Sequence, residues 1–90
     1  MAIGATIPFS KARRVILRDD FCCRYCGKKL KLEQITFDHV IPIARYGRAN
    51  VENLVVCCKV CNNIKGKELI LPKTKPHRNH RQVEELINSS

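Results

Sequence analysis

Two cysteine pairs, Cys23-Arg24-Tyr25-Cys26 and Cys58-Lys59-Val60-Cys61, decide how this chain folds. Four thiolates in two Cys-x-x-Cys units are a common ligand set for one tetrahedral zinc ion. Gly27 directly follows Cys26, where the turn of such a unit needs a residue that tolerates positive φ. The spacing therefore predicts a structural zinc site at Cys23, Cys26, Cys58 and Cys61 that joins two distant parts of the chain.

A further cysteine precedes each pair and leaves a second choice of ligands open. Cys22 and Cys57 would give the rival pairs Cys22/Cys26 and Cys57/Cys61, each with three intervening residues. We favour the two-residue spacing, because Gly27 suits the turn of that spacing. Cys22 and Cys57 are then interpreted as small, buried apolar residues.

The chain is short and strongly basic. Its 90 residues predict one domain with a modest core, which a metal ion could staple. Lys and Arg number 17 against 8 for Asp and Glu, which gives a formal net charge of +9. So much positive charge on a small body indicates a polyanionic partner, most simply nucleic acid.

The sequence also indicates a reducing compartment. Residues 1–8 are too short for the charged lead and apolar core of a signal peptide, and no apolar run is long enough to span a membrane. We therefore expect a cytoplasmic, intracellular protein without a membrane partner. Thiols stay reduced there, which favours zinc over disulfides.

Hydrophobic periodicity predicts a mixed α+β chain. Residues 11–18 suit a helix that Ser10 could cap. Residues 35–43 and 54–57 are β-branched and apolar, and they predict two strands that pair as an antiparallel hairpin. A second helix is expected over 59 to about 69.

The composition changes at Pro72. Residues 72–81 hold two prolines and four Lys or Arg residues without an acid, which predicts an extended arm. Residues 82–87 could add a short helix. The predicted organisation is a functional domain over 1–71 and a basic C-terminal extension over 72–90.

A polar pair, Asp38-His39, interrupts the first predicted strand near its end. An ionised aspartate offers a hard oxygen ligand for Mg²⁺. A neutral imidazole can take a proton from water near neutral pH. The pair by itself is ambiguous, because a buried histidine beside a carboxylate is common.

Three separated elements in one order resemble the HNH (His-Asn-His) endonuclease family of the zinc-stapled kind. They are residues 38–42, the pair at 53–54, and residues 58–66 with the pattern Cys-x-x-Cys-Asn-x-x-Lys-Gly. The resemblance implies a small ββα-metal (His-Me finger) fold, here with an N-terminal helix and a four-cysteine zinc site. It also implies metal-dependent hydrolysis of DNA phosphodiester bonds.

Carried over by position, the resemblance gives each polar residue a role. His39 would be the general base and Asp38 a ligand of the catalytic ion. Asn53 fits the middle letter, which orders the loop and helps to hold the base. Asn62 stands where the family often has its second histidine, and its amide oxygen favours Mg²⁺ or Mn²⁺. Asn63 is the neighbouring alternative.

Basic residues flank these positions. Arg45 and Arg48 in the loop, with Lys65 and Lys67 at the helix end, could hold DNA phosphates. Lys65 is the stronger candidate of the two lysines. A monomer with one site would nick DNA, whereas a symmetric homodimer could cut both strands.

The sequence is also compatible with two other functions. A non-catalytic, zinc-stapled DNA-binding module would explain the charge and the four cysteines, but not the order of Asp38, His39, Asn53 and Asn62. A redox or zinc-storage protein would use only the thiols.

Overall fold

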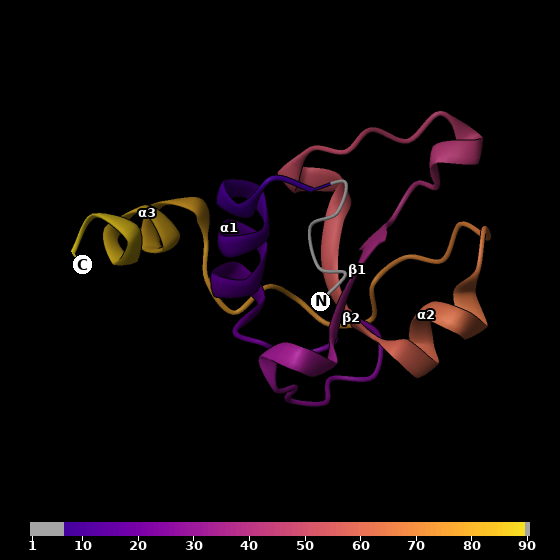
Figure 1. The fold of residues 1–90 in the computed structure, drawn as a ribbon, viewed down its shortest axis with the longest axis horizontal. Coiled ribbons are helices and arrows are strands. Elements are labelled where there is room, and N and C mark those ends of the chain that lie inside the picture. Colours follow the sequence, from indigo (N-terminus) through magenta and orange to yellow (C-terminus); the bar gives the residue numbers. More distant parts are fainter. Residues whose placement is uncertain (1–6, 90) are drawn as a thin grey trace.

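A computed structural model describes residues 7–89 of the chain. A two-stranded antiparallel sheet lies between α1 and α2, and α3 lies beyond α1 (Figure 1). No helix within the described residues is long and apolar enough to cross a bilayer. The predicted α+β class is confirmed, with the bounds α1 Phe9–Asp19, β1 Ile35–His39, β2 Leu54–Cys58, α2 Lys59–Lys65 and α3 His80–Asn88.

The first helix packs its apolar face on β2. Ala12, Val15 and Ile16 are buried along this face. The helix begins at Phe9 with Pro8 as its N-cap, and no side chain caps it. The expected cap at Ser10 is therefore wrong. Pro8 instead contributes its backbone carbonyl, which accepts a hydrogen bond from the N–H of Ala12 at 3.0 Å.

The hairpin forms with one regular register. Ile35 pairs with Cys58 and His39 pairs with Leu54. β1 is shorter than predicted and ends at His39, because Pro42 lacks an N–H group and instead begins a 3₁₀ turn over Ile43–Arg45. The polar pair therefore lies at the very end of the strand.

The second helix is also shorter than predicted. α2 ends at Lys65, because Gly66 turns the chain with φ of +54°. Its first residue follows β2 directly, so the strand, the second cysteine pair and the helix form one continuous unit.

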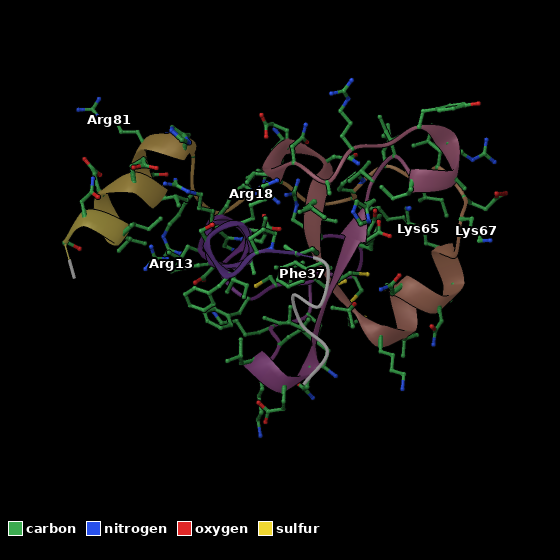
Figure 2. All side chains as sticks on the ribbon, turned by 45° about the horizontal axis from the view of Figure 1, so that its top comes forward. Arg13, Arg18, Phe37, Lys65, Lys67 and Arg81 are labelled. Atoms are coloured by element: carbon green, nitrogen blue, oxygen red, sulfur yellow. The ribbon has the colours of Figure 1, made fainter. Side chains whose placement is uncertain are left out.

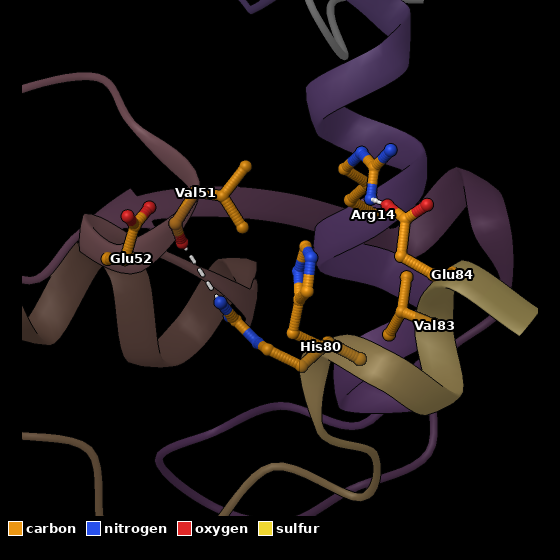
Figure 3. Close-up of a pocket in the computed structure, with 7 residues that line it drawn as sticks. Arg14, Val51, Glu52, His80, Val83 and Glu84 are labelled. Carbon is orange, nitrogen blue, oxygen red and sulfur yellow. Dashed lines mark hydrogen bonds and ion pairs between the residues drawn. The ribbon is translucent and has the colours of Figure 1, made fainter.

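The C-terminal segment is attached to the body of the molecule. The N–H groups of Lys73 and Thr74 both donate to the carbonyl of Arg24 at 3.0 Å. Asn79 caps α3, which begins two residues earlier than predicted. This helix packs against α1 with Val83 buried, and Glu84 forms an ion pair with Arg14 (Figure 3).

One buried carboxylate joins three parts of the fold. Asp19 is fully buried at the end of α1 and binds Arg18 Nε at 2.8 Å and Arg24 Nη1 at 2.9 Å. Its Oδ2 also accepts a hydrogen bond from the backbone N–H of Val56 at 3.0 Å. Asp19 thereby ties α1 to the first cysteine pair and to the central strand.

Candidate functional site

The four cysteines of the two pairs meet in one cluster. Their Sγ atoms, from Cys23, Cys26, Cys58 and Cys61, all lie within 4.8 Å of one another. The distance between Sγ of Cys26 and Sγ of Cys58 is 3.9 Å. Tetrahedral zinc with Zn–S bonds of about 2.3 Å needs sulfur atoms about 3.8 Å apart. The cluster could therefore hold a metal ion such as zinc.

Backbone N–H groups point at two sulfur atoms of this cluster and favour their thiolate form. The N–H of Cys26 points to Sγ of Cys23 at 3.5 Å, and the N–H of Cys61 points to Sγ of Cys58 at 3.4 Å. Burial raises the pKa of Cys23, but the surrounding N–H groups outweigh burial and bring this pKa to about 6. Burial and the neighbouring thiols raise the pKa of Cys61 to about 12. A bound cation would relieve this repulsion between thiolates.

The two remaining cysteines lie outside the cluster. The thiol of Cys22 donates to the carbonyl of Asp20, and the thiol of Cys57 donates to the carbonyl of Cys58. Cys57 is fully buried in β2, and burial raises its pKa. The structure thus brings together Cys23/Cys26 and Cys58/Cys61, the pairs with two intervening residues. Cys22 and Cys57 are buried among the apolar residues of the core.

A second group of polar residues converges on a cleft between β1 and α2. Asp38 and His39 come from the end of β1, and Asn62 comes from the middle of α2. The amide nitrogen of Asn62 donates to Oγ1 of Thr36 at 3.1 Å, and its amide oxygen could serve as a ligand for a cation. Asn63 is exposed and lies outside the lining of the cleft.

Asn53 closes the loop between the two strands. Its Oδ1 accepts from the N–H of Ile41 at 2.8 Å, and its Nδ2 donates to the carbonyls of Ile41 and Arg48. The carbonyl of Asn53 accepts from the N–H of Val40, the residue after His39. One residue therefore fixes the backbone that follows His39.

Comparison with known proteins agrees with this arrangement. A family model described as HNH endonuclease matches residues 23–76, which is more than half of the chain. The chain belongs to the HNH endonuclease family. It is also 38% identical over 52 residues to the CRISPR-associated endonuclease Cas9 of Corynebacterium diphtheriae. That alignment covers 57% of this chain but only 5% of the Cas9 protein.

In this HNH chain the carboxylate of Asp38 already has two partners. Asp38 is 5% exposed, and its Oδ2 accepts the phenol hydrogen of Tyr25 at 2.7 Å. Lys65 Nζ lies 3.1 Å from the same oxygen and 3.3 Å from Oδ1. Burial, followed by the bond to Asp38, raises the pKa of Tyr25 well above its usual value.

The sequence reasoning missed Tyr25, Arg24 and Asp19. Tyr25 and Arg24 lie between the cysteines of the first pair, and the sequence analysis gives neither residue a role. Their place in the sequence is a usable signal. The turn between two clustered cysteines has a defined backbone conformation, so a side chain on that turn can reach one specific partner elsewhere in the fold.

The basic residues of the HNH domain differ in their availability. Lys65 is only 2% exposed, and its Nζ contacts Asp38 and the carbonyl of His39 rather than solvent. Its amine is therefore occupied by Asp38 in this structure and is not presented at the surface, where a DNA phosphate would contact it. Lys67 lies on the rim of the cleft, further out than Lys65 (Figure 2).

The two loop arginines are exposed. Arg45 Nη2 lies 3.2 Å from a carboxylate oxygen of Glu68, so part of its charge is already neutralised. Arg48 is exposed beside the loop that Asn53 closes. Lys67 therefore offers an available positive charge at the cleft, and Arg48 offers one in the loop between the two strands.

Proposed function

We propose that this chain is a divalent-metal-dependent endonuclease that hydrolyses DNA phosphodiester bonds. The observation that carries the proposal is the convergence of Asp38, His39 and Asn62 on one cleft from two elements. A carboxylate and an amide oxygen suit a hard cation, and an imidazole beside them suits proton transfer from water. Membership of the HNH family supports nuclease chemistry at this place.

Each residue has a distinct task in this proposal. Asp38 and Asn62 bind Mg²⁺ or Mn²⁺, and that cation, when bound, stabilises the charge that develops on the leaving 3′ oxygen. His39 removes a proton from the attacking water. Asn53 keeps the backbone after His39 in place, which would hold the imidazole in position for this proton transfer.

The four-cysteine cluster has a structural task in this proposal. We propose zinc as its ion, because four thiolates at this spacing form a closed tetrahedral site without an open position. Such an ion joins the first cysteine pair to the start of α2. The ion thereby helps to hold α2, which carries Asn62, close to β1, which carries Asp38.

DNA is the proposed substrate and partner. The net charge of +9 favours a polyanion. Lys67 at the cleft and the exposed loop residues Arg45 and Arg48 would hold flanking phosphates. One chain acting alone would nick one strand, and a homodimer would be needed to cut both strands from two identical sites.

The direct test is cleavage of supercoiled plasmid with Mg²⁺ or Mn²⁺. We expect His39→Ala to abolish nicking while circular dichroism and zinc content stay those of the wild type. Asn62→Ala should raise the Mn²⁺ concentration needed for cleavage, whereas the matched variant Asn63→Ala should not. Full activity of His39→Ala would exclude His39 as the base.

One observation favours the alternative of a non-catalytic DNA-binding module. The carboxylate of Asp38 is already neutralised by Lys65, as it would be in a purely structural ion pair. A chain of this kind would bind DNA and leave supercoiled plasmid intact with every divalent metal tried. Nicking that depends on both His39 and added metal would exclude the module.

A further inference from the structure

Lys65 has an unusual position for a lysine near a DNA-binding surface. It is the last residue of α2, and only 2% of it is exposed. Its Nζ lies 3.0 Å from the carbonyl oxygen of His39 and within 3.3 Å of both carboxylate oxygens of Asp38. The ammonium group therefore uses its donors on the two residues proposed to carry the chemistry.

The charge balance of the cleft explains why this contact forms. A buried carboxylate needs a positive partner, because transfer of a lone charge from water into the interior costs several kcal/mol. In the described structure Lys65 supplies that partner to Asp38. The proposed nuclease needs the same carboxylate as a ligand for a divalent cation. The Lys65 ammonium and the divalent cation repel each other, so both cannot be close to Asp38 without an electrostatic cost.

We propose that Lys65 is the resident counter-ion of Asp38 and competes with the catalytic cation for it. The ammonium neutralises Asp38 while no divalent cation is bound, and it withdraws from the carboxylate when the cation enters. Lys65 thus sets the metal affinity of the cleft. This inference rests on the proposed function, because it assumes that Asp38 is a metal ligand.

The surroundings of Lys65 allow such a withdrawal. Its four-carbon stem is flexible, and the exposed Gly66 follows it with φ of +54°. Gly66 and Lys67 are both exposed, so the end of α2 that carries Lys65 lies at the surface of the molecule. Tyr25 is a neutral donor, so it can stay on Oδ2 of Asp38 at 2.7 Å and keep the carboxylate in place.

The test compares Mn²⁺ binding to the zinc-loaded full chain and to its Lys65→Met variant. The electron paramagnetic resonance signal of free Mn²⁺ reports binding without any cleavage. We expect Lys65→Met to bind Mn²⁺ about ten-fold more tightly, because the competing charge is gone. We also expect its metal-free melting temperature to fall and its Mn²⁺-induced rise in melting temperature to exceed that of the wild type.

Three further variants make the result specific. Lys59→Met removes an exposed lysine at the other end of the same helix and should leave Mn²⁺ affinity unchanged. Lys65→Arg keeps the positive charge and should not tighten binding. If Lys65→Met does not fold, Lys65→Gln keeps a donor without charge and should tighten binding in the same direction.

The outcomes separate this inference from the proposed function. If Asp38→Asn abolishes Mn²⁺ binding but Lys65→Met and Lys65→Gln bind no more tightly than the wild type, the competition is overturned and the metal site stands. If wild-type binding of Mn²⁺ does not depend on Asp38 at all, the proposed metal site fails and the inference fails with it.

Discussion

Tyr25 donates its phenol hydrogen to Oδ2 of Asp38 across 2.7 Å, so a residue of the first cysteine pair directly holds a residue of the candidate cleft. Its neighbour Arg24 reaches the other way, to the buried carboxylate of Asp19 at 2.9 Å. Arg24 and Tyr25, which lie between two cysteines of the cluster, therefore contact the core on one side and the cleft on the other.

The bond between Tyr25 and Asp38 predicts a loss of stability at alkaline pH. Burial and Asp38 raise the pKa of Tyr25 in the folded chain above the unfolded value of about 10. The neutral phenol therefore stabilises the fold fully below about pH 10, and this contribution falls as pH rises above that value. Urea unfolding of the zinc-loaded chain between about pH 8 and pH 11 should show this decline.

Two tyrosine variants check the assignment. Tyr25→Phe should be less stable near neutral pH, by about 1–2 kcal/mol, and should show a flatter alkaline decline. Tyr46 is 96% exposed, so Tyr46→Phe should keep the wild-type profile. An identical alkaline decline in Tyr25→Phe would assign the effect to another group.

Removal of the ion from the cysteine cluster should unfold the chain. Structural zinc contributes about 10–16 kcal/mol in zinc-finger peptides, which matches or exceeds the whole stability of a small domain. We expect a strong zinc chelator to abolish the cooperative melt followed by circular dichroism. Metal analysis should find one zinc in Cys22→Ala and none in Cys26→Ala, because Cys26 belongs to the cluster and Cys22 does not. A chelated chain that still melts cooperatively would argue against a structural ion.

Asp19 should be among the most sensitive positions for stability. Asp19→Asn keeps the size of the side chain but leaves the buried ends of Arg18 and Arg24 without their counter-charge. We expect a loss of about 3–5 kcal/mol in urea unfolding. Asp20→Asn is a matched control, because Asp20 and its partners Lys29 and Arg78 are all partly solvent-exposed and each such pair contributes about 0–1 kcal/mol. Equal losses in both variants would contradict the proposed importance of burial.

Asn53 should matter for the loop more than for the core. Asn53→Ala removes the side-chain bonds to Ile41 and Arg48, so the backbone after His39 gains freedom. We expect plasmid nicking to fall about 100-fold, the scale of loss that a small misplacement of a catalytic group causes. Limited proteolysis should cut the loop 40–53 faster than in the wild type. Glu52→Gln, at the neighbouring exposed position, should change neither, and a compact loop in Asn53→Ala would refute this role.

Arg48 should contribute to DNA affinity through a phosphate. Loss of one phosphate contact reduces the slope of log affinity against log salt by about 0.9. We expect this reduction for Arg48→Ala in a His39→Ala background, measured by fluorescence anisotropy with duplex DNA. Arg81→Ala is the control, because Arg81 lies on α3, away from the cleft (Figure 2). An equal reduction in both variants would indicate a general effect of net charge.

Much of the fold could be predicted from local patterns. Each Cys-x-x-Cys pair, each β-branched run (35–43 and 54–57) and each element of the motif is a short pattern of neighbouring residues. The hairpin and α2 follow from these patterns. The ends of β1 and α2 were predicted too late, because Pro42 and Gly66 act on the backbone before the apolar pattern stops.

The sequence by itself determined the class of the fold and the four-cysteine cluster, because ligand spacing and strand periodicity are local properties. Its resemblance to the HNH family pointed to Asp38, His39 and Asn62. Only the tertiary structure decided which side chains meet the buried carboxylates of Asp19 and Asp38. Arg24, Tyr25 and Lys65 carry no local signal of these contacts. Their partners become neighbours only when the cysteine pairs and the strands pack, and burial then requires every charge to find a counterpart.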